Sequence, residues 1–132
     1  NDDIKVPDNI TLLGNITDKE RLAKMYSMAD LTVIASKKET FSMIVAESLC
    51  CGTPIVGFKA GAPEMIALPE YSVFSEYGDL DILERNVRLF IDKKCVGISE
   101  KAAGVYSRER MVSNYLQLYL SLSNEAIKED DS

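Results

Sequence analysis

Short runs of apolar and β-branched residues alternate with stretches of helical periodicity along most of the chain. The runs lie at residues 10–13, 31–35 and 55–57, with a weaker one at 72–74. Strands that are separated by helices form a parallel sheet with helices on both of its faces. We therefore predict an α/β fold, a Rossmann-like parallel sheet.

The helices between these runs begin at recognisable signals. Thr17, with Glu20 three residues later, forms a capping box at the start of the first helix. Further helices are expected over about 42–51, from 78 to about 92, and over 108–123. The pattern thus predicts one helix in each long connection and a helix at the end.

Ligands of such sheets bind beyond the carboxyl ends of the strands, close to helix N-termini. Three loops of this chain lie at that edge, at residues 14–17, 36–42 and 57–64. Functional residues are therefore expected in these loops and at the starts of the helices that follow them.

Composition excludes several classes of site. The 132 residues suffice for one domain, and a net charge of −6 argues against a nucleic-acid partner. Histidine is absent, so histidine bases and histidine metal ligands are excluded within these residues. Cys50, Cys51 and Cys95 lack the spacing of a zinc site, and the first two, in an apolar run, are expected to be buried and reduced. Reduced thiols fit a cytoplasmic protein, and no apolar run approaches the roughly 18 residues of a membrane span.

Glu47 is the least expected residue of the helix predicted over 42–51. That helix is apolar nearly all round, which predicts that it is buried. A buried carboxylate is costly unless it accepts hydrogen bonds, and no lysine or arginine lies within one turn of it. A pair of ligand hydroxyls would supply the donors. Backbone amides of a neighbouring loop, or a place at the helix edge, would serve equally well.

A second carboxylate, Glu39, lies eight positions before Glu47, at the mouth of the same helix. Two acids at that spacing can hold two parts of an extended ligand, although a loop glutamate is more often only solvated. Thr40, Phe41 and Ser42 lie between them at the helix N-terminus. Free N–H groups and the helix dipole favour a phosphate there. Every helix has such an end, so this feature alone is a weak signal.

Residues 39–64, ETFSMIVAESLCCGTPIVGFKAGAPE, resemble the signature of retaining glycosyltransferases with the GT-B fold, the group 1 or family 4-like enzymes. The family motif is a glutamate, seven residues and a second glutamate. Gly-x-Pro, a hydrophobic strand and a glycine-containing loop ending in Pro-Glu follow it. Residues 10–36 and 107–119 are similar to further segments of the family. Thr40 and Ala60 depart from it, since glycine or proline is common at the first position and glycine at the second.

The resemblance implies that residues 1–132 form the donor-binding domain of a two-domain enzyme, the C-terminal half of a GT-B fold. The N-terminal acceptor domain would precede Asn1 in the same chain, together with the basic pair that neutralises the diphosphate. Glu39 would contact hydroxyls of the donor sugar in a catalytic role, and Glu47 would accept from the nucleotide ribose. The other implied donor-binding residues are Thr40, Phe41 and Ser42 at the phosphate, Asn15 and Ile16 at the base, and Ser36 at the border of the pocket.

The implied reaction transfers a glycosyl group, with retention, from a nucleoside diphosphate sugar to an acceptor hydroxyl in polysaccharide or glycolipid synthesis. The resemblance implies no metal and no cofactor besides this donor. The acceptor would be a polysaccharide or a lipid-linked sugar, and this domain alone is expected to be inactive. A cytoplasmic location is expected, with peripheral membrane contact of the whole protein left open.

Two other functions remain open at this stage. Some epimerases of nucleotide sugars share the GT-B architecture. A non-catalytic nucleotide-binding or receiver-like signalling domain is the alternative from another class, but Asp30 precedes its strand rather than following it. In the C-terminal part, Tyr106, Tyr115 and Tyr119 are expected to pack in the core, and residues 129–132 to form a solvated tail.

Overall fold

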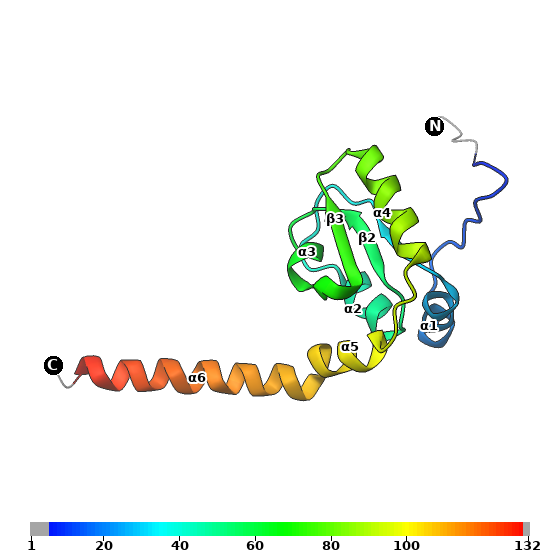
Figure 1. The fold of residues 1–132 in the computed structure, drawn as a ribbon. Coiled ribbons are helices and arrows are strands. Elements are labelled where there is room, and N and C mark those ends of the chain that lie inside the picture. Colours follow the sequence, from blue (N-terminus) through cyan, green and yellow to red (C-terminus); the bar gives the residue numbers. More distant parts are fainter. Residues whose placement is uncertain (1–5, 131–132) are drawn as a thin grey trace.

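The computed structural model describes residues 6–130, with side chains as far as Ser123. Its centre is a parallel sheet of three strands, β1 (Thr32–Ile34), β2 (Ile55–Phe58) and β3 (Ser72–Ser75), in the order β1-β2-β3 (Figure 1). The predicted α/β fold with a parallel sheet is therefore confirmed.

Helices fill the connections and cover the sheet. α4 packs on β2 and β3, whereas α2 packs on β2 and in turn carries α1 and α5 (Figure 1). The helical elements are α1 (Lys19–Met28), α2 (Met43–Cys50), α3 (Pro63–Ile66), the 3-10 turn η1 (Pro69–Tyr71), α4 (Leu80–Asp92), α5 (Ile98–Tyr106) and α6 (Arg108–Asp130).

The hydrophobic core lies between the sheet, α2 and α5. Its buried members are Ile34, Val45, Leu49, Ile55, Ala67, Leu68, Ile98 and Ala102. The central strand β2 is buried along its whole length. A Cβ atom added at Gly57 would lie 2.6 Å from the carbonyl oxygen of Ile34, so the close approach of β1 and β2 requires glycine there.

The strand predicted over 10–13 is wrong for the described structure. Ile10, Leu12 and Leu13 are 51%, 75% and 48% exposed, and the segment belongs to no strand. A strand needs a neighbour with which to exchange hydrogen bonds, and β-propensity alone does not create one. Within residues 6–130 no strand pairs with this segment.

The helices differ from those predicted in two respects. The N-cap of α1 is Asp18 rather than Thr17, and its Oδ1 accepts from the N–H groups of Glu20 (2.9 Å) and Arg21 (3.3 Å). The predicted capping box is therefore displaced by one residue, because a carboxylate one position further on takes the cap. Helix α5 was not predicted at all. Its short apolar pattern buries only two side chains, those of Ile98 and Ala102.

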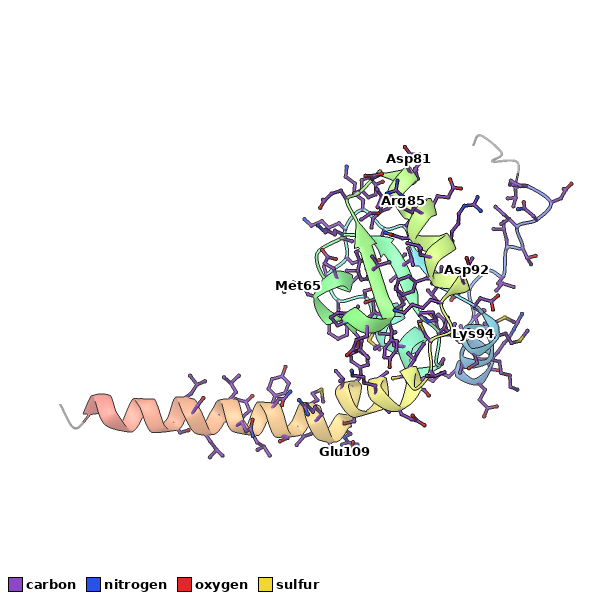
Figure 2. All side chains as sticks on the ribbon, viewed as in Figure 1. Met65, Asp81, Arg85, Asp92, Lys94 and Glu109 are labelled. Atoms are coloured by element: carbon purple, nitrogen blue, oxygen red, sulfur yellow. The ribbon has the colours of Figure 1, made fainter. Side chains whose placement is uncertain are left out.

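The last helix, α6, projects away from the body of the domain (Figure 1). As far as Ser123, its side chains spread into solvent around the helix, with no other element beside most of this stretch (Figure 2). Tyr106 is partly buried against the core as predicted, but Tyr115 and Tyr119 are 55% and 63% exposed, so their predicted core packing is wrong. Of the predicted tail 129–132, the first two residues continue α6 and the last two lie outside the described residues. Among the helices within residues 6–130, none is both long and apolar enough to cross a membrane.

Candidate functional site

Helix α2 begins with an unusual backbone conformation at its N-cap, Ser42. This residue has φ 60° and ψ 70°, in the left-handed region, and it is the one non-glycine residue with positive φ in the described part of the chain. The left-handed conformation costs a residue with a Cβ atom roughly 1–2 kcal/mol. The Ser42 side chain makes no capping hydrogen bond, so the first N–H groups of α2 receive no side-chain acceptor from it.

The hydroxyl of Ser42 is buried and has no partner. The residue is 7% exposed, and its Oγ makes no hydrogen bond within the described residues. Ser75, at the end of β3, has an Oγ in the same condition. Buried hydroxyls normally find a partner, and the N-terminus of a helix favours an anion. The start of α2 is therefore suited to receive oxygen atoms of a ligand, above all those of a phosphate.

Glu39 lies in the loop between β1 and α2, where it is half-buried. Its Oε1 accepts from the hydroxyl of Ser36 at 2.7 Å, so the structure brings these two predicted site residues together. Its backbone N–H donates to the carbonyl of Ala60 at 2.9 Å, and Glu39 forms an isolated parallel bridge with Gly61. The loops that follow β1 and β2 are thereby joined at the carboxyl edge of the sheet.

Glu64 stabilises the second of these loops. Its two carboxylate oxygens accept from the N–H groups of Ala60 (3.0 Å) and Gly61 (2.9 Å). Desolvation acts to raise the pKa of Glu64, but these backbone hydrogen bonds and the nearby Lys59 outweigh it and hold the pKa below its ordinary value. The side chain therefore fixes the loop that borders Glu39.

The prediction that α2 is buried on all sides is wrong. Its buried residues are Val45, Ser48 and Leu49, whereas Met43 and Ile44 are 57% and 40% exposed. Positions i, i+3 and i+4 share one face of a helix, and that face alone packs on the core. The prediction of buried thiols fails for the same reason at the end of α2. Cys50 lies off this face and is exposed, Cys51 is half-buried, and all three cysteines are free.

Glu47 lies on the flank of α2 and is half-buried. Its Oε2 accepts a long hydrogen bond, 3.4 Å, from the hydroxyl of Tyr26 in α1. Its Oε1 accepts none from the described residues. The described residues therefore supply one donor to a carboxylate that can accept about four hydrogen bonds. Tyr26 was not predicted as a site residue, because no local signal relates it to Glu47, 21 positions away in sequence.

The other predicted site residues are more exposed. Thr40 and Phe41 lie at the mouth of α2, and Phe41 is 59% exposed. Ahead of α1, Asn15 is exposed, with no hydrogen bond to the described residues, and Ile16 is half-buried. Their contact with a phosphate or a base stays a prediction.

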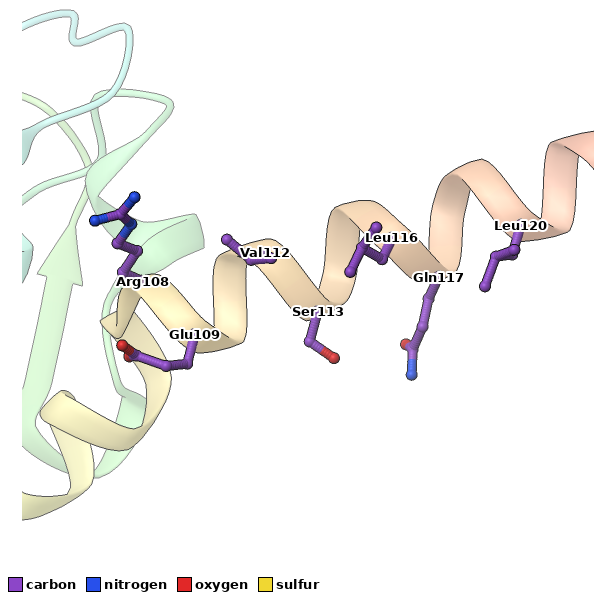
Figure 3. Close-up of a pocket in the computed structure, with 7 residues that line it drawn as sticks. All are labelled: Arg108, Glu109, Val112, Ser113, Leu116, Gln117 and Leu120. Carbon is purple, nitrogen blue, oxygen red and sulfur yellow. The ribbon is translucent and has the colours of Figure 1, made fainter.

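Two grooves differ in their relation to this site. One, of about 430 Å³, is lined by Phe41 and Met43 on one side and by the junction of α5 and α6 on the other, so it borders the start of α2. A groove of about 500 Å³ runs along α6, and Figure 3 shows its lining residues on that single helix. The groove on α6 is an open helix surface and contains none of the predicted site residues.

The fold and this edge define a class of protein. A parallel sheet with helices on both faces places Glu39 and an uncapped helix start at its carboxyl edge, with Glu47 farther along the same helix, as in Rossmann-like domains. Comparison with known families makes the assignment specific. Residues 2–110 match the model of the family described as glycosyl transferases, group 1, and the chain belongs to this family.

Curated relatives are similar over parts of the chain. An N-acetyl-alpha-D-glucosaminyl L-malate synthase of Bacillus anthracis is 28% identical over 88% of this chain and 32% of its own length. A D-inositol 3-phosphate glycosyltransferase of Mycobacteroides abscessus is 37% identical over 45% of this chain and 13% of its own. One of the same name from Thermomonospora curvata is 48% identical over 30% of this chain and 9% of its own. The chain thus spans a third or less of the curated relatives it matches.

Proposed function

We propose that this chain binds the nucleoside diphosphate sugar donor of a retaining glycosyltransferase of the GT-B fold, and that it stabilises the departing diphosphate. The observation that carries the proposal is the start of α2. There a strained, left-handed serine keeps a buried hydroxyl, which has no partner among the described residues, beside uncapped helix N–H groups. An anionic oxygen at this point would satisfy these donors and meet the positive end of the helix dipole.

The distal phosphate of the donor would contact the backbone N–H groups of Phe41 and Ser42 and the Ser42 hydroxyl. Negative charge grows on the diphosphate as the glycosidic bond breaks. Fixed donors aimed at that charge lower the barrier without having to reorganise. Such donors are supported here by the rigid packing of α2, whose next turns are anchored in the core.

The two carboxylates would bind opposite ends of the donor. Glu39 is oriented by Ser36 and by its backbone bond to the loop after β2, and this supports a role in positioning the sugar ring through its hydroxyls. Glu47 has unused acceptor capacity, which supports acceptance from the ribose hydroxyls. Asn15 and Ile16 would lie at the base. No metal or cofactor forms part of this proposal.

The acceptor, a polysaccharide or lipid-linked hydroxyl, would bind to an N-terminal domain of the same protein. The large exposed apolar side chains of residues 10–13 and of α6 offer surfaces for contact with such a domain. The whole enzyme would act in the cytoplasm or at the face of a membrane. The chain alone would bind the donor without turnover.

Titration of the chain with UDP, GDP and ADP by calorimetry tests donor binding. We expect at least one diphosphate to bind and Glu47→Gln to weaken its binding. The control Glu84→Gln makes the same change at an exposed glutamate of α4 and should leave the affinity unchanged. Absence of binding by all three, or equal binding by wild type and Glu47→Gln, would refute the proposal. Incubating a longer form with donor alone separates transfer from the epimerase alternative, because an epimerase would release the epimer without an acceptor.

A further inference from the structure

Helix α1 is fixed to the end of α2 by hydroxyl groups. The Thr53 hydroxyl, in a residue only 2% exposed, donates to the carbonyl of Tyr26 at 2.5 Å. The next residue, Ser27, donates its hydroxyl to the carbonyl of Cys51 at 3.3 Å. Two adjacent residues of α1 are thus tied to the segment that follows α2, and the bond to its carbonyl holds the backbone of Tyr26 in place.

This attachment brings the Tyr26 hydroxyl to Glu47. The donor and the Oε2 acceptor are 3.4 Å apart, although the residues are 21 positions apart in sequence. Burial, and then the adjacent Glu47, raise the pKa of Tyr26 above its ordinary value, so the hydroxyl keeps its proton and remains a donor at neutral pH. A carboxylate held through one oxygen presents the other in a fixed direction. The side chain of Glu47 would otherwise rotate freely at its terminal torsion.

We propose that Tyr26 is a positioning residue that orients the Glu47 carboxylate toward the ribose hydroxyls of the nucleotide, and so favours ribonucleotides over deoxyribonucleotides. The inference rests on the proposed function, since it names a residue that acts through Glu47 at that site. A bidentate contact with a vicinal diol requires the carboxylate to face the two hydroxyls with an acceptor position free on each oxygen, and the bond from Tyr26 leaves one free on Oε2. Tyr26 accordingly contributes to recognition of the diol and not to recognition of the phosphates.

The test compares the best-binding nucleoside diphosphate with its 2′-deoxy form on four proteins: wild type, Tyr26→Phe, Glu47→Gln and Ser27→Ala. Ser27→Ala is the matched control, because it removes one hydroxyl bond between α1 and α2 without touching Glu47. We expect Tyr26→Phe to weaken the ribonucleotide roughly five- to tenfold, as for loss of one hydrogen bond. The deoxynucleotide keeps its 3′-hydroxyl but lacks the diol, so Tyr26→Phe should weaken it less than it weakens the ribonucleotide, and Ser27→Ala should change neither affinity.

Equal weakening of both nucleotides in Tyr26→Phe, or the same loss in Ser27→Ala, would overturn the inference and leave a structural role only. A double variant, Tyr26→Phe with Glu47→Gln, provides a second measurement. If Tyr26 acts through Glu47, its substitution has no further effect on ribonucleotide affinity in the Glu47→Gln background, whereas additive losses contradict the inference.

The outcomes also separate the two proposals. If wild type binds no diphosphate, the proposed function fails and the inference fails with it. If wild type prefers the ribonucleotide and Glu47→Gln abolishes that preference while Tyr26→Phe retains it, the inference alone fails. A circular dichroism melt of each variant establishes that the proteins compared are folded.

Discussion

Replacing Ser42 with glycine is expected to make the domain more stable and its ligand binding weaker. The substitution leaves the backbone bond from the Val45 N–H to the Ser42 carbonyl in place. It removes two unfavourable features, the Cβ atom in a left-handed conformation and the buried hydroxyl without a partner. Strained backbone and unpaired buried groups of this kind cluster at ligand sites, where they serve binding.

The expected change in the free energy of unfolding follows from the backbone strain and the unpaired hydroxyl that are removed. Relief of the left-handed strain is worth roughly 1–2 kcal/mol, and removal of an unpaired buried hydroxyl roughly 1–3 kcal/mol. The greater freedom of glycine in the unfolded chain offsets about 0.5–1 kcal/mol of this. We therefore expect the free energy of unfolding of the unliganded domain to rise by at least about 1 kcal/mol. Loss of a hydrogen bond to a charged phosphate costs about 1.5–3 kcal/mol, so nucleotide affinity should fall roughly 10- to 100-fold.

Urea unfolding curves and calorimetric titrations measure the two quantities on the same samples. Ser42→Ala is the matched control. It removes the hydroxyl but keeps the Cβ atom, so it should lose as much affinity as Ser42→Gly while gaining less stability. The reasoning is refuted if Ser42→Gly is less stable than wild type, or if its nucleotide affinity is unchanged.

The remaining predictions concern the fold around the site. Leu49→Ala, at a fully buried position in the core, should lower the free energy of unfolding by about 2–5 kcal/mol in urea. The same change at Leu122, 53% exposed on α6, should stay within about 0.5 kcal/mol. Gly57→Ala should lower the melting temperature, because its Cβ would meet the carbonyl oxygen of Ile34 at 2.6 Å, and an unchanged melt would contradict the strand geometry. Glu64 stabilises the fold above its ordinary pKa of 4.5, and this contribution is lost as pH falls through its lower folded value. Glu64→Gln should therefore flatten the acid side of a stability–pH profile, and an identical profile would count against the loop bonds.

Elements with a strong apolar pattern and a local partner could be predicted from the sequence. The strand expected over 55–57 is β2, which is buried throughout, and the helix expected from 78 to about 92 is α4, which lays one half-buried face at helical spacing on the sheet. The segment 10–13 has an equally apolar pattern and forms no strand. A strand depends on its neighbour in the sheet, and a local pattern does not reveal whether a neighbour is present.

The same distinction holds within the site. Ser36 and Glu39, three residues apart in one loop, were predicted to lie in the site and do contact each other. The contact of Tyr26 with Glu47 was not predictable, because it depends on how α1 docks on α2, to which packing and the hydroxyls of Ser27 and Thr53 contribute. The left-handed backbone of Ser42 was equally hidden, since serine carries no signal for positive φ.

Core packing of helix α2 accounts for both the left-handed backbone at its N-cap, Ser42, and the direction of the Glu47 carboxylate. Its face at Val45 and Leu49 has no exposed surface, so the packing of the core fixes the rotation of the helix about its axis. A residue two positions beyond Val45 then has one direction available, and Glu47 must point along the flank toward α1. The same packing resists relaxation of the backbone at Ser42. Cavities made at Val45 or Leu49 should therefore weaken nucleotide binding as well as stability, although neither side chain would touch the ligand.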